Sequence, residues 1–144
     1  MKFFSIFRAF AVSVLAAVLL CGCTNHDRAI EEMVNELNSP AFRAKQAKTG
    51  FFDDTVVSVE GQQIIMKFLC RPFINLASID REEYTQLETA TVNEFRAHLV
   101  DEQFKKGLEA MRAKDMTLLL DWRDVNGFSI KIMVDPAVIL EPEP

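Results

Sequence analysis

LLLDWRDVNGFSIKIMV, residues 118–134, contains the clearest secondary-structure signal in this chain of 144 residues. Apolar residues alternate with other residues on both sides of the Asn126-Gly127 pair. A period of two is typical of strands that bury one face, and Asn-Gly between two such segments favours a hairpin. The stretch therefore predicts a β-hairpin. The alternating positions are Leu118, Leu120 and Trp122 before the turn, and Phe128, Ile130, Ile132 and Val134 after it.

The register of this hairpin depends on the length of its turn. A two-residue turn would mix charged partners into the apolar face, because a slip of one residue reverses the side on which every side chain lies. A three-residue turn over 125–127, with its glycine left-handed in a bulge, keeps the apolar face intact. It also places Asp121 beside Lys131 on the opposite face, as an opposite-charge pair. The predicted apolar pairs are Trp122 with Ile130, Leu120 with Ile132, and Leu118 with Val134.

A second hairpin is predicted over residues 51–71, where the period is again two. Gly61-Gln62 separates two alternating sets, and a two-residue turn with glycine first suits type II′. That turn pairs Val59 with Ile64 and Val57 with Met66 on one face. The alternating positions are Val57 and Val59 before the turn, and Ile64, Met66, Phe68 and Cys70 after it.

Helical segments flank the two hairpins. Asp80 with Glu83 three residues later is a capping box, and Thr91 with Glu94 repeats the signal. One helix over 80–113 would be long for a compact domain, so we expect two helices that divide near 89–91. The expected helices are 27–38, 40–48, 80 to about 90, and 92–113.

The last of these helices carries an apolar stripe, and the segments around it are irregular. Asn75–Ser78 is predicted to be a loop, and Gly107 marks a bend or a close approach to the sheet. The proline-rich end, 136–144, is expected to be extended. The stripe consists of Val92, Phe95, Leu99, Val100, Phe104, Leu108 and Met111.

The order helix, hairpin, helix, hairpin predicts an α+β fold. We expect an antiparallel sheet of about four strands, formed by the two hairpins, with helices packed on one face. Over roughly 50–135 this order is similar to that of small uncharacterised bacterial lipoproteins. The similarity implies no known activity.

The first residues of the chain have the parts of an export signal. Lys2 and Arg8 precede the apolar run Ala9–Leu20, and LCGC follows at 20–23. A basic start, an apolar core and a small residue before a cut are typical of such signals. The apolar run is shorter than the roughly 20 residues of a membrane-spanning helix. A signal is therefore favoured, with an uncleaved anchor and simple secretion as the alternatives.

The LCGC box resembles the lipobox of bacterial lipoproteins, in which a Leu precedes the lipidated Cys by three residues. The resemblance implies that Cys23 is diacylated on sulfur, that the chain is cut before it, and that its new amino group is acylated. Cys21 replaces the usual Ala or Ser. The expected divisions are signal peptide 1–22, lipidated N-terminus and spacer 23–28, a single α+β domain 29–135, and tail 136–144.

Charge limits the expected partners. Removal of residues 1–22, which hold two basic and no acidic residues, changes the net charge from −5 to −7. This balance argues against nucleic acid and against a polybasic grip on lipid. The membrane is therefore contacted through the acyl chains on Cys23. In many two-membrane bacteria an Asp directly after the lipidated Cys retains a lipoprotein in the inner membrane, and this chain has Thr24 there. We therefore expect the protein to be anchored in the outer membrane, facing the periplasm, or in the plasma membrane where the source has only one membrane.

Cys70 and His98 are the residues that could form a nucleophilic pair. A catalytic thiolate needs a positive and accessible setting. A single Cys on the apolar face of a strand is more often a small buried hydrophobe. We therefore assign no catalytic residue and expect Cys70 to face the core.

One helix face has residues that could bind a metal. Glu94, His98 and Glu102 follow each other at intervals of four, with Asp101 beside them. Imidazole and carboxylate ligands so placed can bind a metal, but the same spacing is usual on a solvated face. We predict no metal and no cofactor.

Three classes of function remain, in order of preference. The first is a non-enzymatic, lipid-anchored envelope protein that binds another protein or acts as an accessory factor. The alternative is a module that binds a small apolar ligand or a peptide between helix and sheet. An enzyme using Cys70 or His98 is the third.

Overall fold

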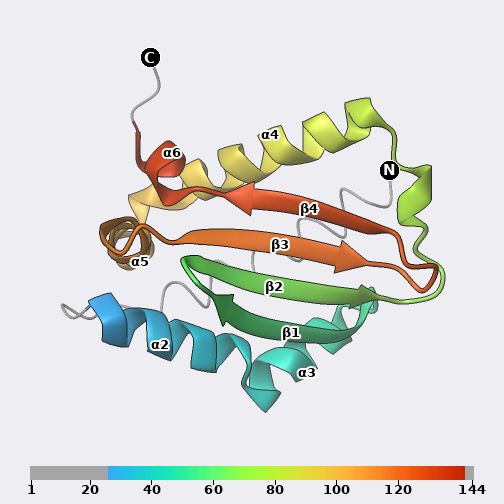
Figure 1. Ribbon diagram of the computed structural model, residues 1–144, viewed down its shortest axis with the longest axis horizontal. Coiled ribbons are helices and arrows are strands. Elements are labelled where there is room, and N and C mark those ends of the chain that lie inside the picture. Colours follow the sequence, from blue (N-terminus) through green and yellow to red (C-terminus); the bar gives the residue numbers. More distant parts are fainter. Residues whose placement is uncertain (1–25, 142–144) are drawn as a thin grey trace.

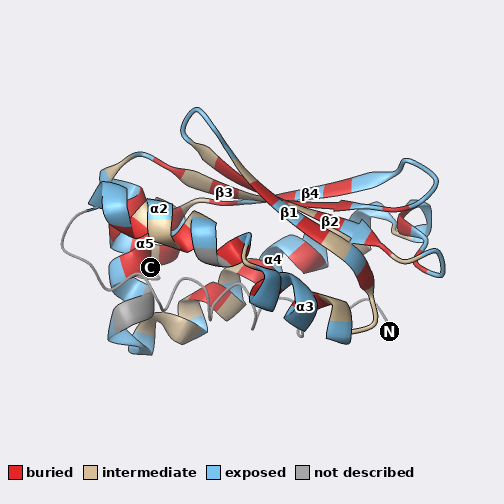
Figure 2. Ribbon diagram, turned by 90° about the horizontal axis from the view of Figure 1, so that it is seen from below, coloured by how far each residue is buried: buried red, intermediate tan, exposed pale blue. Residues whose placement is uncertain are grey.

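The computed structural model describes residues 26–141, apart from the side chains of Glu36, Gln103 and Phe104. Its centre is a four-stranded sheet in the order β1-β2-β3-β4, with the described helices on one side (Figures 1 and 2). The α+β prediction with helices on one face is confirmed. The elements are α2 His26–Leu37, α3 Pro40–Lys48, β1 Phe52–Glu60, β2 Gln63–Cys70, η1 Leu76–Ser78, α4 Arg81–Ala97, η2 His98–Val100, α5 Glu102–Ala113, β3 Thr117–Arg123, β4 Ser129–Val134 and α6 Pro136–Leu140.

The central pair of strands differs from the prediction. β1 with β2 and β3 with β4 are antiparallel hairpins, but β2 and β3 are parallel. The sheet is therefore mixed rather than purely antiparallel. The reason is the connection between the two hairpins, because α4 and α5 return the chain to the end at which β2 began. A parallel pair requires such a crossover of a dozen or more residues.

The C-terminal hairpin has the predicted register. Trp122 pairs with Ile130, and Asp121 lies opposite Lys131. Asp124 donates its backbone N–H to the carbonyl of Phe128 at 3.0 Å, which closes the three-residue turn. The glycine of that turn has a φ of 87°, as a left-handed bulge requires. Phe128, which was predicted to belong to the apolar set, is exposed and lies between the turn and the start of β4.

The N-terminal hairpin also has the predicted register. Val57 pairs with Met66 and Val59 with Ile64. Gly61 has a φ of 59° while the next residue keeps a negative φ, as in a type II′ turn. Val59 lies close to this turn and is largely exposed, so only the other three of these side chains are buried.

The predicted division of the long helix near 89–91 is wrong. α4 is continuous across that point. The Thr91 hydroxyl donates to the carbonyl of Leu87 at 2.7 Å within the helix, so it does not cap the start of a new helix. The chain leaves the α-helix only at His98–Val100, and Val100 is 90% exposed instead of lying on the apolar stripe. The Phe104 side chain lies outside the described residues. The capping box that begins α4 is confirmed.

Two segments predicted as irregular contain short helices. Leu76–Ser78 is one turn of 3₁₀ helix. Pro136–Leu140 forms α6, so the extended tail was wrong for these residues. Asp135 caps α6, and proline is well suited to a first helical position. Ile139 packs into the core, which stabilises the turn. Residues 142–144 lie outside the described part.

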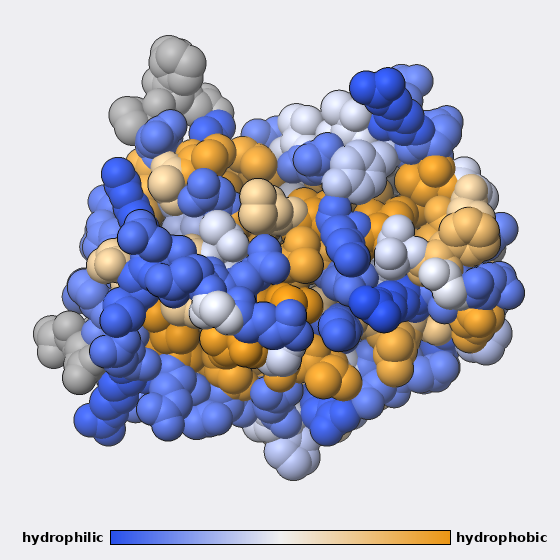
Figure 3. Space-filling view, in the orientation of Figure 1, coloured by the Kyte–Doolittle hydropathy of each residue, from blue (hydrophilic) through white to orange (hydrophobic). Residues whose placement is uncertain are grey.

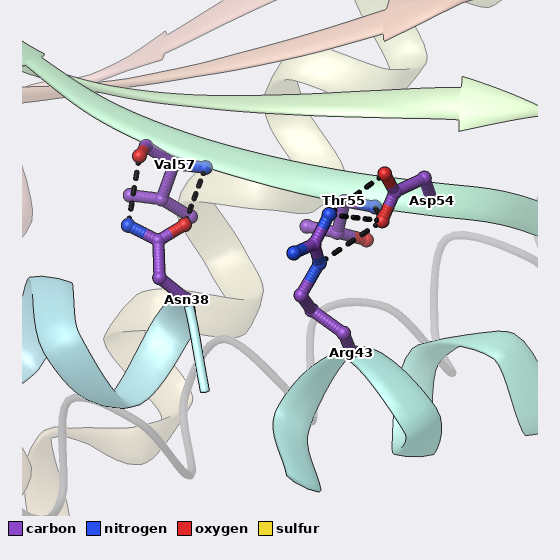
Figure 4. A network of polar contacts seen from close by, with 5 residues as sticks. All are labelled: Asn38, Arg43, Asp54, Thr55 and Val57. Carbon is purple, nitrogen blue, oxygen red and sulfur yellow. Dashed lines mark hydrogen bonds and ion pairs between the residues drawn. The ribbon is translucent and has the colours of Figure 1, made fainter. Parts of the chain in front are cut away.

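On each edge strand of the sheet, one residue has its backbone bound by a side chain. At β1, Asn38 donates to the Val57 carbonyl at 2.9 Å and accepts from its N–H at 3.0 Å (Figure 4). Nearby, Arg43 holds both oxygens of Asp54, which lowers the pKa of that carboxyl. At β4, the Tyr84 hydroxyl donates to the backbone carbonyl of Lys131 at 2.6 Å. Such contacts hinder pairing with a further strand. The face of the sheet that the helices do not cover is therefore the more accessible surface for a partner.

Candidate functional site

The predicted lipidation site, Cys23, lies outside the described residues. The first described element, α2, begins three residues later at His26. Within residues 26–141, no helix is both long and apolar enough to cross a bilayer. The lipobox therefore stays a prediction.

Cys70 is a core residue, as expected. It ends β2, is 4% exposed, and lies on the same face as the buried Met66 and Phe68. Burial, and to a smaller degree the charge of Asp124, raise the pKa of the thiol to about 12, against the opposite effect of a hydrogen bond from the Arg123 backbone. A thiol of this kind is protonated at neutral pH and is a poor nucleophile.

His98 is not brought to Cys70. It follows α4 and begins η2, and its Nδ1 lies 2.9 Å from the carbonyl oxygen of Glu94 and 3.9 Å from the carboxylate of the same residue. The end of β2 and the end of α4 lie at opposite ends of the sheet (Figure 1). The structure therefore separates the two members of the nucleophilic pair that was considered.

The helix face that was considered for a metal is interrupted. Glu94 belongs to α4, whereas Glu102 begins α5 after the break at 98–100. In the described part of the chain, no group of three or more His, Cys, Asp or Glu side chains could hold a metal ion. Intervals of four residues place side chains on one face only within a continuous helix, so the spacing does not indicate a metal site here.

The most distinctive surface is the face of the sheet opposite the helices, which we call the outer face. No helix among residues 26–141 lies over it (Figure 2). Figure 3 shows this face, where apolar areas are divided by polar side chains. From the alternation of the strands, its members are Val56, Ser58 and Glu60 of β1, Gln63, Ile65, Lys67 and Leu69 of β2, Thr117, Leu119, Asp121 and Arg123 of β3, and Ser129, Lys131 and Met133 of β4.

The apolar members of the outer face include large exposed side chains. Met133 is 60% exposed, and Val56 and Leu69 are each exposed by more than two fifths. Leu119 is half-buried, and Ile65 beside it is buried within the same row. Such apolar area between polar groups is typical of an interaction surface.

The charged members of the outer face form a cluster around one carboxylate. The strand registers place Lys67, Asp121 and Lys131 directly opposite each other on β2, β3 and β4. Arg123, two residues further along β3, is bound to Asp121 through Nε at 3.2 Å and Nη2 at 3.1 Å, both to Oδ2. The carboxylate thus binds the arginine of its own strand instead of the predicted Lys131. We call these four residues the basic cluster.

Asp121 is the most deeply buried charged side chain on this face. It is 1% exposed, and its second oxygen, Oδ1, accepts no hydrogen bond. A buried carboxylate is costly unless cations lie close to it. The three cations of the basic cluster supply that environment, with Arg123 in direct contact.

A second carboxylate, Asp124, fixes the loops at the same end of the sheet. Its Oδ1 accepts from the N–H groups of Asn126 and Phe128, at 2.9 and 3.0 Å. Its Oδ2 accepts from the N–H of Leu76 at 3.0 Å, which joins the β2–α4 connection to the hairpin turn. An Asp before a turn is a visible sequence signal, but its bond to Leu76 depends on the parallel pairing and was not predicted.

A shallow open groove lies between α4, η2 and α6. Its volume is about 440 Å³, and its lining includes Arg96, Leu99 and Ile139. It lies between helices rather than between helix and sheet, where the alternative function placed a ligand.

Comparison of the chain with protein-family models, with curated proteins and with solved structures finds no match.

Proposed function

We propose that this is a non-enzymatic, lipid-anchored envelope protein that binds another protein through its outer face. The observation that carries the proposal is the uncovered outer face itself, where exposed apolar side chains surround the basic cluster. Interfaces combine an apolar centre with polar groups that fix orientation. The side-chain contacts on the two edge strands favour this face over strand addition as the route of binding.

The location in the cell rests on the LCGC box. Cys23 carries the acyl chains, and Thr24 directs the protein to the outer membrane, facing the periplasm, in a two-membrane source. Several chains make the attachment stable, whereas one chain holds a protein only reversibly. Fractionation of the envelope tests the sorting, and recovery in the inner membrane alone would contradict it.

The partner surface is tested by photo-crosslinking of the full chain in cells. A benzophenone amino acid replaces Met133 on the outer face, and in a matched variant it replaces Val138 on α6, which is also exposed. The proposal expects a protein adduct from position 133 that is absent from position 138. No adduct at 133, or the same adducts at both positions, would contradict it.

A second candidate function is the binding of a small apolar or peptide ligand. The groove between α4, η2 and α6 is the observation that favours it, since its volume falls within the range of ligand sites. Native mass spectrometry of the detergent-solubilised full chain would show a bound small molecule. Ala97→Trp, which fills the groove, would remove that molecule.

A further inference from the structure

We propose that the basic cluster binds a carboxylate group of the partner protein while apolar side chains of the partner rest on Leu119 and Met133. This inference deepens the proposed function, since it rests on a protein partner at the outer face. It specifies the chemistry of that partner as an acidic and apolar segment.

The first argument is the position of the Arg123 guanidinium. Asp121 Oδ2 holds it through Nε and Nη2, so its Nη1 group is left for another acceptor. An arginine already fixed by a buried carboxylate loses little conformational freedom when it binds a second acceptor. Paired N–H groups of arginine also match the geometry of a carboxylate.

The second argument is the charge balance of the cluster. Lys67, Lys131 and Arg123 supply three positive charges against the one of Asp121, in a chain whose net charge is −5. The basic cluster thus has an excess of positive charge in a protein that is acidic as a whole. Glu60, on the same face, lies at the β1–β2 turn, away from the row of Lys67 and Lys131. Leu119 and Leu69 border the cluster on its two sides. A carboxylate bound between them is partly removed from water, which strengthens its attraction to these cations.

The third argument concerns the competing occupants. A second copy of this chain would bring the same positive excess against itself, and like charges across an interface are unfavourable. An anionic bilayer would meet the cations, but it has no fixed pattern of apolar and acidic groups to match the strand spacing. A protein segment can present both at defined positions.

The experiment uses the full chain in a neutral detergent and a designed probe. The probe is a fluorescent amphipathic helix of Leu, Ala and Glu, and its matched counterpart has Lys in place of Glu. Binding is measured by fluorescence anisotropy. The Glu probe is expected to bind at least about tenfold more tightly than the Lys probe, and more weakly as salt is added.

Charge-reversed variants locate the binding. Lys67→Glu with Lys131→Glu should weaken binding of the Glu probe by about tenfold or more. The matched control, Lys45→Glu with Lys48→Glu, makes the same charge change on exposed positions of α3 and should leave the affinity within about twofold. Circular dichroism confirms that both variants are folded.

Three results would overturn the inference. They are equal binding of the two probes, an equal loss in the control variant, and displacement of the Glu probe by phosphatidylglycerol added to the detergent micelles, which would assign the face to a membrane. None of these depends on acylation of Cys23 or on the crosslinking at Met133. Failure of the carboxylate site is therefore distinct from failure of the proposed function.

Discussion

Asn38 binds the backbone of Val57 as a neighbouring strand would, with one hydrogen bond to its carbonyl and one from its N–H. The amide lies at the junction of α2 and α3, so one side chain both joins two helices to the sheet and closes the edge of β1 (Figure 4). At Val57, a side chain thus occupies the backbone groups of β1 that a further strand would otherwise bind.

Replacement of Asn38 tests this edge. Asn38→Ala removes both hydrogen bonds, and we expect the free energy of unfolding to fall by about 1–2 kcal/mol. Urea unfolding followed by Trp122 fluorescence measures the change. Asn35→Ala, on an exposed position of α2, should change stability by less than about 0.5 kcal/mol. Equal effects of the two variants would show that the amide pair contributes nothing specific.

The thiol of Cys70 should react slowly in the native state. Its pKa is raised to about 12 by burial, so the thiolate is scarce at neutral pH. Ellman's reagent should label it rapidly only in denaturant, with Cys70→Ala as the background control. That variant should lose about 1 kcal/mol of stability. Rapid native labelling at neutral pH would instead identify Cys70 as a reactive site.

The same pKa gives a stability trend with pH. The thiol is more acidic in the unfolded chain, near 9.0, than in the folded chain, near 12. The folded state therefore binds the proton more tightly, and this contribution to stability is complete below pH 9. It should decline as the pH rises through 9 toward 12, and Cys70→Ala should lack that part of the decline.

Asp124 should influence both the turn and the thiol. Asp124→Asn leaves one acceptor oxygen where two now bind N–H groups of Leu76 on one side and of Asn126 and Phe128 on the other. One of these sets must be lost, which should cost about 1–2 kcal/mol. It also removes a charge that raises the pKa of Cys70. Labelling of Cys70 by Ellman's reagent in the folded variant should therefore begin at a lower pH than in the unsubstituted protein. Asp115→Asn removes an exposed charge and is the control. An unchanged labelling profile in Asp124→Asn would contradict the electrostatic link.

The lipobox prediction is tested at its own cysteines. Cys23→Ala should abolish incorporation of a labelled fatty acid and leave a larger, uncleaved precursor. Cys21→Ala restores the more usual residue inside the box and should keep the label. Persistent labelling of the Cys23 variant would show that the acyl chain is attached elsewhere.

The two hairpins could be predicted because their registers are determined locally. Gly61 and Gly127 each adopt a positive φ that sets the turn, and alternation on both sides then leaves one register that buries the apolar set. The capping box of α4 was equally local. Each of these features depends on residues only a few positions apart.

The features that were missed depend on contacts distant in the sequence. The parallel pairing of β2 with β3 follows from the path of α4 and α5, which no turn residue specifies. The basic cluster was missed for the same reason, because Lys67 reaches Asp121 only across that pair. The break in the helix at His98–Val100 contains no Gly or Pro that would have indicated it. The helix α6 is stabilised by the burial of Ile139, a contact that the local sequence does not reveal.

The parallel centre of the sheet also has a consequence for the order of folding. Gln63 and Thr117, which meet where β2 and β3 begin, are 54 positions apart. Each hairpin can form early from neighbouring residues, but the junction between them must wait until this long connection closes, which costs chain entropy. During that interval β2, with the sequence QIIMKFLC, is an open apolar edge. Were the chain exported residue by residue, as the LCGC box predicts, this edge would stay unpaired until residues 117–134 had emerged.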